Sequence, residues 1–299
     1  MRKIVLNKVS EPKATWGGPW TEKKLQAFEE YVLAYLKIMH KNPYWKTIYF
    51  DGFAGCGERN IEKNAPNLFD LDLDSGDANV YRGAAERLIK LQKPDIFDWY
   101  YFIDKDATSI KKLESKLKSI QESKNKNIIY RANDCNEELV KLSGALKKRK
   151  YAALIFLDPF GMQINWESIA QLAGSRSDLW ILLPTGMIIN RLLDKNGELK
   201  NIKKLISFFG INEESIRKKF YKTIEYKDLF GKDVKDMDKI IDPINKIAEL
   251  YIENLKQIWK YVSHPLRLNN KKGVALFHFI LASNSQAAQK IANHIIRNV

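Results

Sequence analysis

The sequence predicts an α/β fold built around a mainly parallel sheet. Short β-rich runs alternate with amphipathic helical segments through the first two-thirds of the 299-residue chain. One run, Tyr151 to Asp158, is almost continuously apolar, which is typical of a central parallel strand buried on both faces. Strands that alternate with helices form right-handed βαβ units, so we expect one domain that spans residues 1–299.

Hydrophobic spacing locates the individual elements. A first helix is expected over residues 21–41, where apolar side chains recur every three to four positions and Thr21 can cap the first turn. The strands expected after it are residues 46–51, 99–104, 127–131, 151–158 and 179–184, and the helices between them are residues 82–93, 107–121, 136–148 and 165–173. Residues 58–80 are polar and rich in turn residues, which predicts a surface insertion.

The alternation stops after about residue 186. Residues 187–258 are basic, have helical spacing and contain no obvious strand, so we expect a helical insertion there. Two β-rich runs follow, residues 259–268 and 274–282, and the polar segment between them predicts an antiparallel hairpin. A final helix is expected over residues 285–298.

Composition excludes several classes of protein. Hydrophobic residues make up 45% of the chain, which suffices for a sizeable core and argues against wholesale disorder. No apolar run approaches the roughly 20 residues of a membrane span, and the first residues lack a signal-peptide pattern. We therefore expect a cytoplasmic protein with no membrane partner. Two cysteines and four scattered histidines predict no disulfide framework and no metal site.

The net charge is +14, and it is concentrated in the last third of the chain. Residues 191–299 hold 21 Lys and Arg against 12 Asp and Glu, a net of +9. A basic protein concentrates polyanions near its surface, which makes nucleic acid a candidate partner. The alternative is that the lysines are simply solvated.

The first candidate site is a glycine-rich turn at the end of the first expected strand. Its spacing, G-x-x-G-x-G, departs from the dinucleotide fingerprint and fits the D-x-F-x-G-x-G loop of methyltransferases, which holds the methionine end of S-adenosylmethionine. Asp51, Phe53, Gly55 and Gly57 are therefore the candidate cofactor-binding residues of this loop. The alternative is an ordinary tight turn, which also needs glycine.

Two later strands end in acidic residues that extend this candidate site. Asp104 ends the second strand, where a carboxylate can accept hydrogen bonds from both ribose hydroxyls. Asp134 follows the third strand, where polar residues of methyltransferases contact the adenine amino group. Each of the two can instead cap the helix that follows it.

The fourth strand ends in Asp158-Pro159-Phe160-Gly161, which resembles the D/N-P-P-Y/F signature of amino-methyltransferases with one proline missing. In that signature the polar side chain accepts a hydrogen bond from an exocyclic amine, and the ring stacks on the base. Trp166 is a candidate second stacking surface or a core anchor. Arg191 is a candidate phosphate contact or a member of an ion pair.

Several segments together resemble the three-Cys-motif partner family (TcmP). They are Gly17–Leu25, Asp51–Gly57, Phe102–Asp104, Phe156–Gln163, Pro184–Gly186, Asn190–Leu193 and Phe277–Ser283. The resemblance implies a Rossmann-like class I methyltransferase sheet with a C-terminal antiparallel hairpin, and a Cys-rich, radical-S-adenosylmethionine-like protein as partner. It also implies that Lys23 lies on the first turn of a helix that packs over the cofactor pocket.

Three hypotheses follow. The main one is an S-adenosylmethionine-dependent methyltransferase that modifies an amino group of a nucleobase in DNA or RNA. A second is a methyltransferase-fold binding partner of the Cys-rich protein, without transfer activity. A third is a nuclease, in which Asp51, Asp104 and Asp158 converge on a metal ion.

Overall fold

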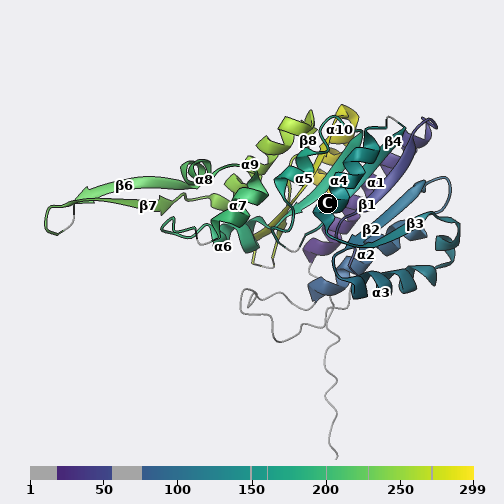
Figure 1. Ribbon diagram of the computed structural model, residues 1–299, viewed down its shortest axis with the longest axis horizontal. Coiled ribbons are helices and arrows are strands. Elements are labelled where there is room, and N and C mark those ends of the chain that lie inside the picture. The colour runs from purple at the N-terminus through teal and green to yellow at the C-terminus, as the bar shows by residue number, and fades with distance from the viewer. Residues whose placement is uncertain are drawn as a thin grey trace, which may run out of the picture.

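The centre of the molecule is a twisted sheet with helices on both faces (Figure 1). The computed structural model describes residues 19–55, 76–148, 150–159, 161–199, 201–227, 229–270 and 272–299. Within these residues the main sheet has eight strands in the order β3-β2-β1-β4-β5-β10-β8, with β9 paired to β10. The strands are β1 (Lys46–Asp51), β2 (Trp99–Asp104), β3 (Ile128–Ala132), β4 (Tyr151–Leu157), β5 (Ser177–Leu183), β8 (Tyr261–Val262), β9 (Leu266–Asn269) and β10 (Ala275–Ser283).

The first five strands are parallel, which confirms the predicted α/β fold with a largely parallel sheet. Strand β10 runs antiparallel to β5, and both β8 and β9 pair antiparallel with β10. The expected C-terminal hairpin is therefore present, but its first run is split into the short strands β8 and β9.

The direction in which the sheet grows reverses between β1 and β4. The chain extends from β1 through β2 to β3 at one edge, and then returns to place β4 on the other side of β1. Asp51, the last residue of β1, lies in register with Phe156 near the end of β4. The carboxyl ends of β1 and β4 therefore form a topological switch point, which is where ligands bind in open α/β sheets.

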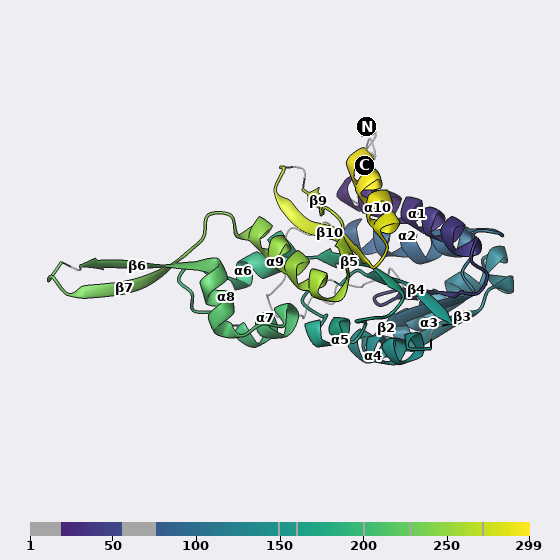
Figure 2. The same cartoon turned by 90° about the horizontal axis from the view of Figure 1, so that it is seen from above.

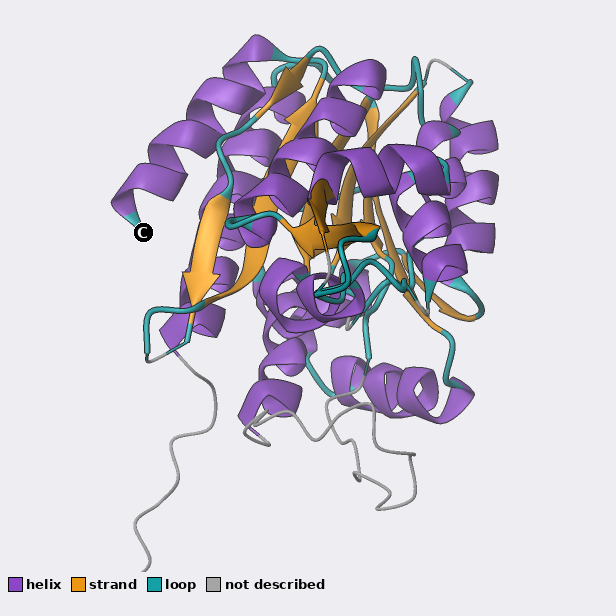
Figure 3. Ribbon diagram, turned by 90° about the vertical axis from the view of Figure 1, so that its left-hand side faces the viewer, coloured by secondary structure: helices purple, strands orange, loops and turns teal. Residues whose placement is uncertain are grey.

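Strand β4 is buried on both faces because helices cover each side of the sheet (Figures 2 and 3). Leu154 and Phe156 face a core shared with α1, α2 and α10, whereas Ile155 and Leu157 face a core shared with α4, α5, α7 and α9. The helices are α1 (Pro19–His40), α2 (Gly76–Lys90), α3 (Ala107–Lys118), α4 (Cys135–Leu146), α5 (Trp166–Ala170), α6 (Asn190–Leu192), α7 (Ile202–Phe209), α8 (Glu213–Phe220), α9 (Pro243–Ile258) and α10 (Gln286–Asn298), with the short helices η1 (Gln121–Asn125) and η2 (Thr185–Ile189). None of the described helices has the length and apolar character of a membrane span.

Three details differ from the expectations. The insertion contains a β-hairpin, β6 (Tyr221–Lys227) and β7 (Asp233–Lys239), which projects from the body in Figure 1, so the expectation of a strand-free insertion was wrong. Helix α1 begins at Pro19, so Thr21 lies inside it and is not its N-cap. Of the expected surface insertion, residues 76–80 belong to α2, and the rest lies outside the described residues.

Candidate functional site

The loop after β1 is fixed to both neighbouring strands. The Gly52 amide donates to the Phe156 carbonyl of β4 at 3.0 Å, and the Ala54 amide donates to the Ile103 carbonyl of β2 at 2.8 Å. A Cβ on Gly52 would lie 2.4 Å from the Sγ of Cys135, so only glycine fits against this cysteine. The loop is therefore held at the switch point by backbone hydrogen bonds and by close packing.

Gly55 and Asp104, two of the predicted cofactor residues, contact each other directly. The Gly55 amide donates to Oδ2 of Asp104 at 3.0 Å, and the Asp106 amide donates to Oδ1 of the same carboxylate at 2.8 Å. Gly55 has a φ of +50°, a conformation that favours glycine. The acid at the end of β2 therefore lies beside the glycine loop, with no helix-capping role. The cap of α3 is Asp106.

Asp51 lies beneath the loop, where its carboxyl is buried. It accepts hydrogen bonds from the Phe53 amide at 3.2 Å and from the Tyr49 hydroxyl at 3.1 Å. Burial raises the pKa of Asp51 to about 7, against the lowering effect of these two donors, and the charges of Asp158 and Asp104 raise it further. The structure thus gives Asp51 a part in shaping the loop, and it brings three predicted acids into one electrostatic cluster.

Asp158 forms a buried ion pair with Lys24 of helix α1. The Nζ of Lys24 lies 2.5 Å from Oδ2 of Asp158, and the two side chains are only 3% and 4% exposed. Pro159 is also buried. Helix α1 therefore places the Lys24 cation at the end of β4, at the centre of the candidate site.

The prediction that selected Lys23 requires correction, because its side chain is exposed and Lys24 is the lysine that faces inward. Lys24, Phe28 and Tyr31 share one buried face of α1 at helical spacing, whereas Lys23 lies beside that face. This spacing is the sequence signal that identifies Lys24.

Asp134 caps helix α4, the alternative role considered for it. Its carboxylate accepts from the Asn136 amide at 2.8 Å, and Lys105 lies 3.8 Å away. The Asn136 side chain then joins this segment to the one after β4, because it donates to the Gln163 carbonyl and accepts from the Asn165 amide. Asp134 therefore organises the loop after β3.

Of the two predicted substrate contacts, Trp166 has a packing role and Arg191 is an exposed side chain. The Trp166 ring packs edge-on against Tyr251 at 5.7 Å and lies over Gly210, where a Cβ would be 2.0 Å from the ring. Trp166 is thus a packing residue, and we remove it from the candidate site. Arg191 is exposed on α6. Gly57 and Phe160 lie outside the described residues.

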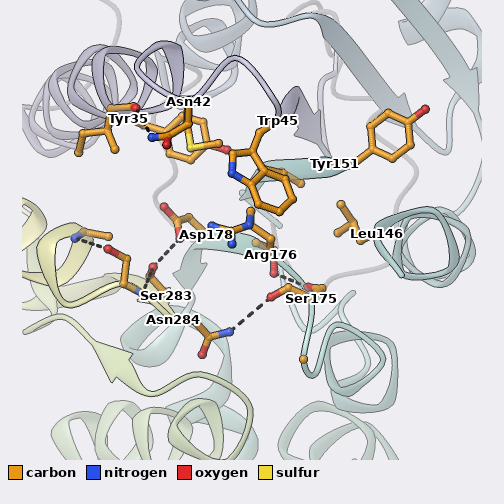
Figure 4. A pocket seen from close by; sticks show the side chains of 18 of the residues that line it. Tyr35, Asn42, Trp45, Leu146, Tyr151, Ser175, Arg176, Asp178, Ser283 and Asn284 are labelled. Carbon is orange, nitrogen blue, oxygen red and sulfur yellow. Dashed lines mark hydrogen bonds between the residues drawn. The ribbon is translucent and has the colours of Figure 1, made fainter. Parts of the chain in front are cut away.

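Two features of the described residues bear on the alternatives. Among the described residues, no group of three or more His, Cys, Asp or Glu side chains is arranged to hold a metal ion. A cavity of about 1000 Å³ is present, but it lies at the amino ends of β4 and β5, opposite the candidate site (Figure 4).

The chain matches no family model and no curated protein. Among solved structures it is similar to protein LPL1258 from Legionella pneumophila str. Philadelphia 1, which carries the family-model description DUF519. The two share 15% sequence identity with a TM-score of 0.41, and the likeness covers 90% of this chain and 99% of that one. A likeness this distant identifies no family for the chain.

Proposed function

We propose that the protein is an S-adenosylmethionine-dependent methyltransferase that acts on an amino group of a nucleobase. The observation that carries this proposal is the gathering of Asp51, Gly55, Asp104 and Asp158 at the carboxyl ends of β1, β2 and β4. Ligands of open α/β sheets bind at this kind of switch point. The parallel strands and the reversed β10 also agree with the class I sheet that the resemblance implies.

The residues around the loop fit the cofactor chemically. The Asp104 carboxylate at the end of β2 has the position from which ribose hydroxyls are bound in nucleotide sites. Gly55 presents no Cβ beside it, so a ligand can approach the backbone closely. When bound, S-adenosylmethionine would supply an electrophilic methyl group. Asp51 would hold the loop in shape beneath it.

We assign to Asp158 the role of binding and orienting the acceptor amine. The Oδ2 of Asp158 accepts a hydrogen bond from Lys24, and an acceptor amine would donate to a remaining lone pair of the same carboxylate. Lys24 compensates the buried negative charge, which is otherwise costly. In this arrangement Asp158 orients the amine, so that the nitrogen lone pair faces the methyl group, and catalysis comes from positioning.

Labelled transfer tests the proposal. The protein is incubated with methyl-labelled S-adenosylmethionine and separate DNA, RNA and protein pools. We expect label in one nucleic-acid pool, and at least a 100-fold lower rate in Asp158→Ala with cofactor binding kept. Ala is chosen over Asn because Asn keeps an oxygen that accepts a hydrogen bond and also occurs at this position of the D/N-P-P-Y/F signature. Asp238→Ala, exposed on β7, is the matched control. Label in protein alone, or a wild-type rate in Asp158→Ala, would contradict the assignment.

A second candidate is a binding module without transfer activity, which the β6–β7 arm favours. The turn of this arm exposes Leu229 fully and Phe230 to 94%. Exposed apolar tips mark interaction surfaces. Residues 221–239 contain five lysines and five acidic residues, so the arm is neutral in a chain of net charge +14, which suits a protein partner better than a polyanion. Calorimetry that detects no S-adenosylmethionine binding would favour this candidate.

A further inference from the structure

The cavity at the amino ends of β4 and β5 has no role in the proposed methyl transfer. It has a volume of about 1000 Å³, and it lies between the end of α1, the starts of β4 and β5, and the start of α10 (Figure 4). Asp158 is at the other end of β4. The cavity is large enough for a small-molecule ligand.

One wall of the cavity presents a positioned cation. The guanidinium carbon of Arg176 lies 3.8 Å from the centroid of the Trp45 ring, and Figure 4 shows the two groups next to each other. This contact positions the guanidinium group, whose N–H donors can bind a phosphate or carboxylate. Within the described residues Arg176 forms no salt bridge, although its charge partly offsets the rise that burial causes in the pKa of Asp178, and Lys147 adds a second cation to the cavity lining.

The start of helix α10 lies on the same cavity. Ser285 caps this 13-residue helix, and its hydroxyl accepts from the Ala288 amide. Asn284 donates to the Ser175 carbonyl at 3.4 Å, which holds the helix start beside the segment that carries Arg176. The first-turn amides and the helix dipole favour an anion at this end.

A buried hydroxyl gives an independent indication that the cavity takes a polar ligand. Tyr35 lines the cavity and is 7% exposed, and its hydroxyl has no hydrogen-bond partner within the described residues. Buried polar groups are normally hydrogen-bonded, and a ligand that fills the cavity would supply the missing partner of this hydroxyl. The nearby Asp178 is already engaged, because it accepts from the hydroxyls of Tyr31 and Ser283.

We propose that this cavity binds a small molecule in which an anionic group, a phosphate or a carboxylate, is joined to an aromatic or apolar body. Arg176 and the start of α10 contact the anion, and the Tyr35 hydroxyl makes a further hydrogen bond. The body packs on the apolar part of the lining, which includes Ile38, Met39 and Leu146. This site is separate from the proposed methyltransferase centre and does not depend on it.

The test uses the full chain and three probes: phenyl phosphate, benzoate and inorganic phosphate. Binding is measured by calorimetry and by the shift of the thermal midpoint. We expect phenyl phosphate or benzoate to bind at least tenfold more tightly than inorganic phosphate, and the stronger of the two identifies the anion. Arg176→Gln should weaken that binding at least tenfold. Lys290→Gln, an exposed charge loss on α10 outside the cavity, should leave it unchanged.

Tyr35→Phe separates a ligand role from a structural one. Because the hydroxyl has no described partner, its removal should leave the thermal midpoint of the free protein unchanged or higher, while it weakens probe binding about threefold or more. The proposal is overturned if none of the probes binds at millimolar concentration. It is equally overturned if Arg176→Gln binds as tightly as the wild type, or if Tyr35→Phe lowers the midpoint of the free protein and leaves binding unchanged.

Discussion

Replacing Lys24 with Met removes the cation from the acid cluster while it keeps most of the side-chain volume. Lys24 and Asp158 lie 2.5 Å apart with 3% and 4% of their side chains exposed. Breaking a buried ion pair by removing one partner costs about 3–5 kcal/mol, since a buried charge loses its compensation. Stabilities of domains are about 5–15 kcal/mol, so Lys24→Met should lower the free energy of unfolding by a large fraction.

Urea unfolding of a double-mutant cycle measures this effect. We expect Lys24→Met combined with Asp158→Asn to cost less than the sum of the two single variants, with a coupling of about 1–3 kcal/mol. The matched control is Lys46→Met, because Lys46 pairs with Asp98 at 3.0 Å but is 46% exposed. An exposed pair contributes about 0–1 kcal/mol. If Lys24→Met cost no more than Lys46→Met, the buried pair would not hold the site together as described.

Three further predictions concern the loop, the acid beneath it and the arm. The raised pKa of Asp51 stabilises the folded state, and this contribution is fully present below the ordinary pKa of 3.8 and is lost as pH rises through about 7. The free energy of unfolding of the wild type should therefore fall by roughly 2 kcal/mol relative to that of Asp51→Asn between pH 5 and pH 8. A pH-independent difference in unfolding free energy would refute this. Gly52→Ala should destabilise by about 1–3 kcal/mol, because its Cβ would meet Cys135 and Leu157, whereas Gly144→Ala, in an open position on α4, should be neutral or stabilising in the same thermal assay. Leu229→Ser with Phe230→Ser should change the unfolding free energy by less than about 0.5 kcal/mol, since both side chains are exposed; a large loss of stability would show that the arm tip packs on the body.

The parts of the fold that bury side chains could be predicted from the sequence. The continuous apolar run of β4 and the β-rich runs of β1, β2 and β5 reflect burial between two layers of helices. The β6–β7 arm could not be found in this way. Nearly all of β6 is exposed, so no alternation of apolar and polar residues distinguishes it from a helix or loop.

The candidate sites also differ in how far they could be predicted from the sequence. Asp104 ends one predicted strand and Gly55 follows another, and the parallel sheet brings them together, so their contact follows from the order of the elements. The choice between Lys23 and Lys24 depends on a rotation of about 100° along one helix, which only the spacing of the buried residues resolves. The cavity at the amino ends of β4 and β5 combines Tyr35, Arg176 and Ser285, which are far apart in the sequence and form no motif.

The most direct test of the central claim is a calorimetric titration of the protein with S-adenosylmethionine. We expect saturable binding at one site per chain, weakened at least tenfold in Asp104→Asn and unchanged in Asp106→Asn. Asn at position 104 has one acceptor oxygen, so it keeps the hydrogen bond from either the Gly55 or the Asp106 amide, and it lacks the negative charge. Absence of binding to the wild-type protein, or equal binding by Asp104→Asn, would contradict a cofactor site at the carboxyl ends of β1 and β2.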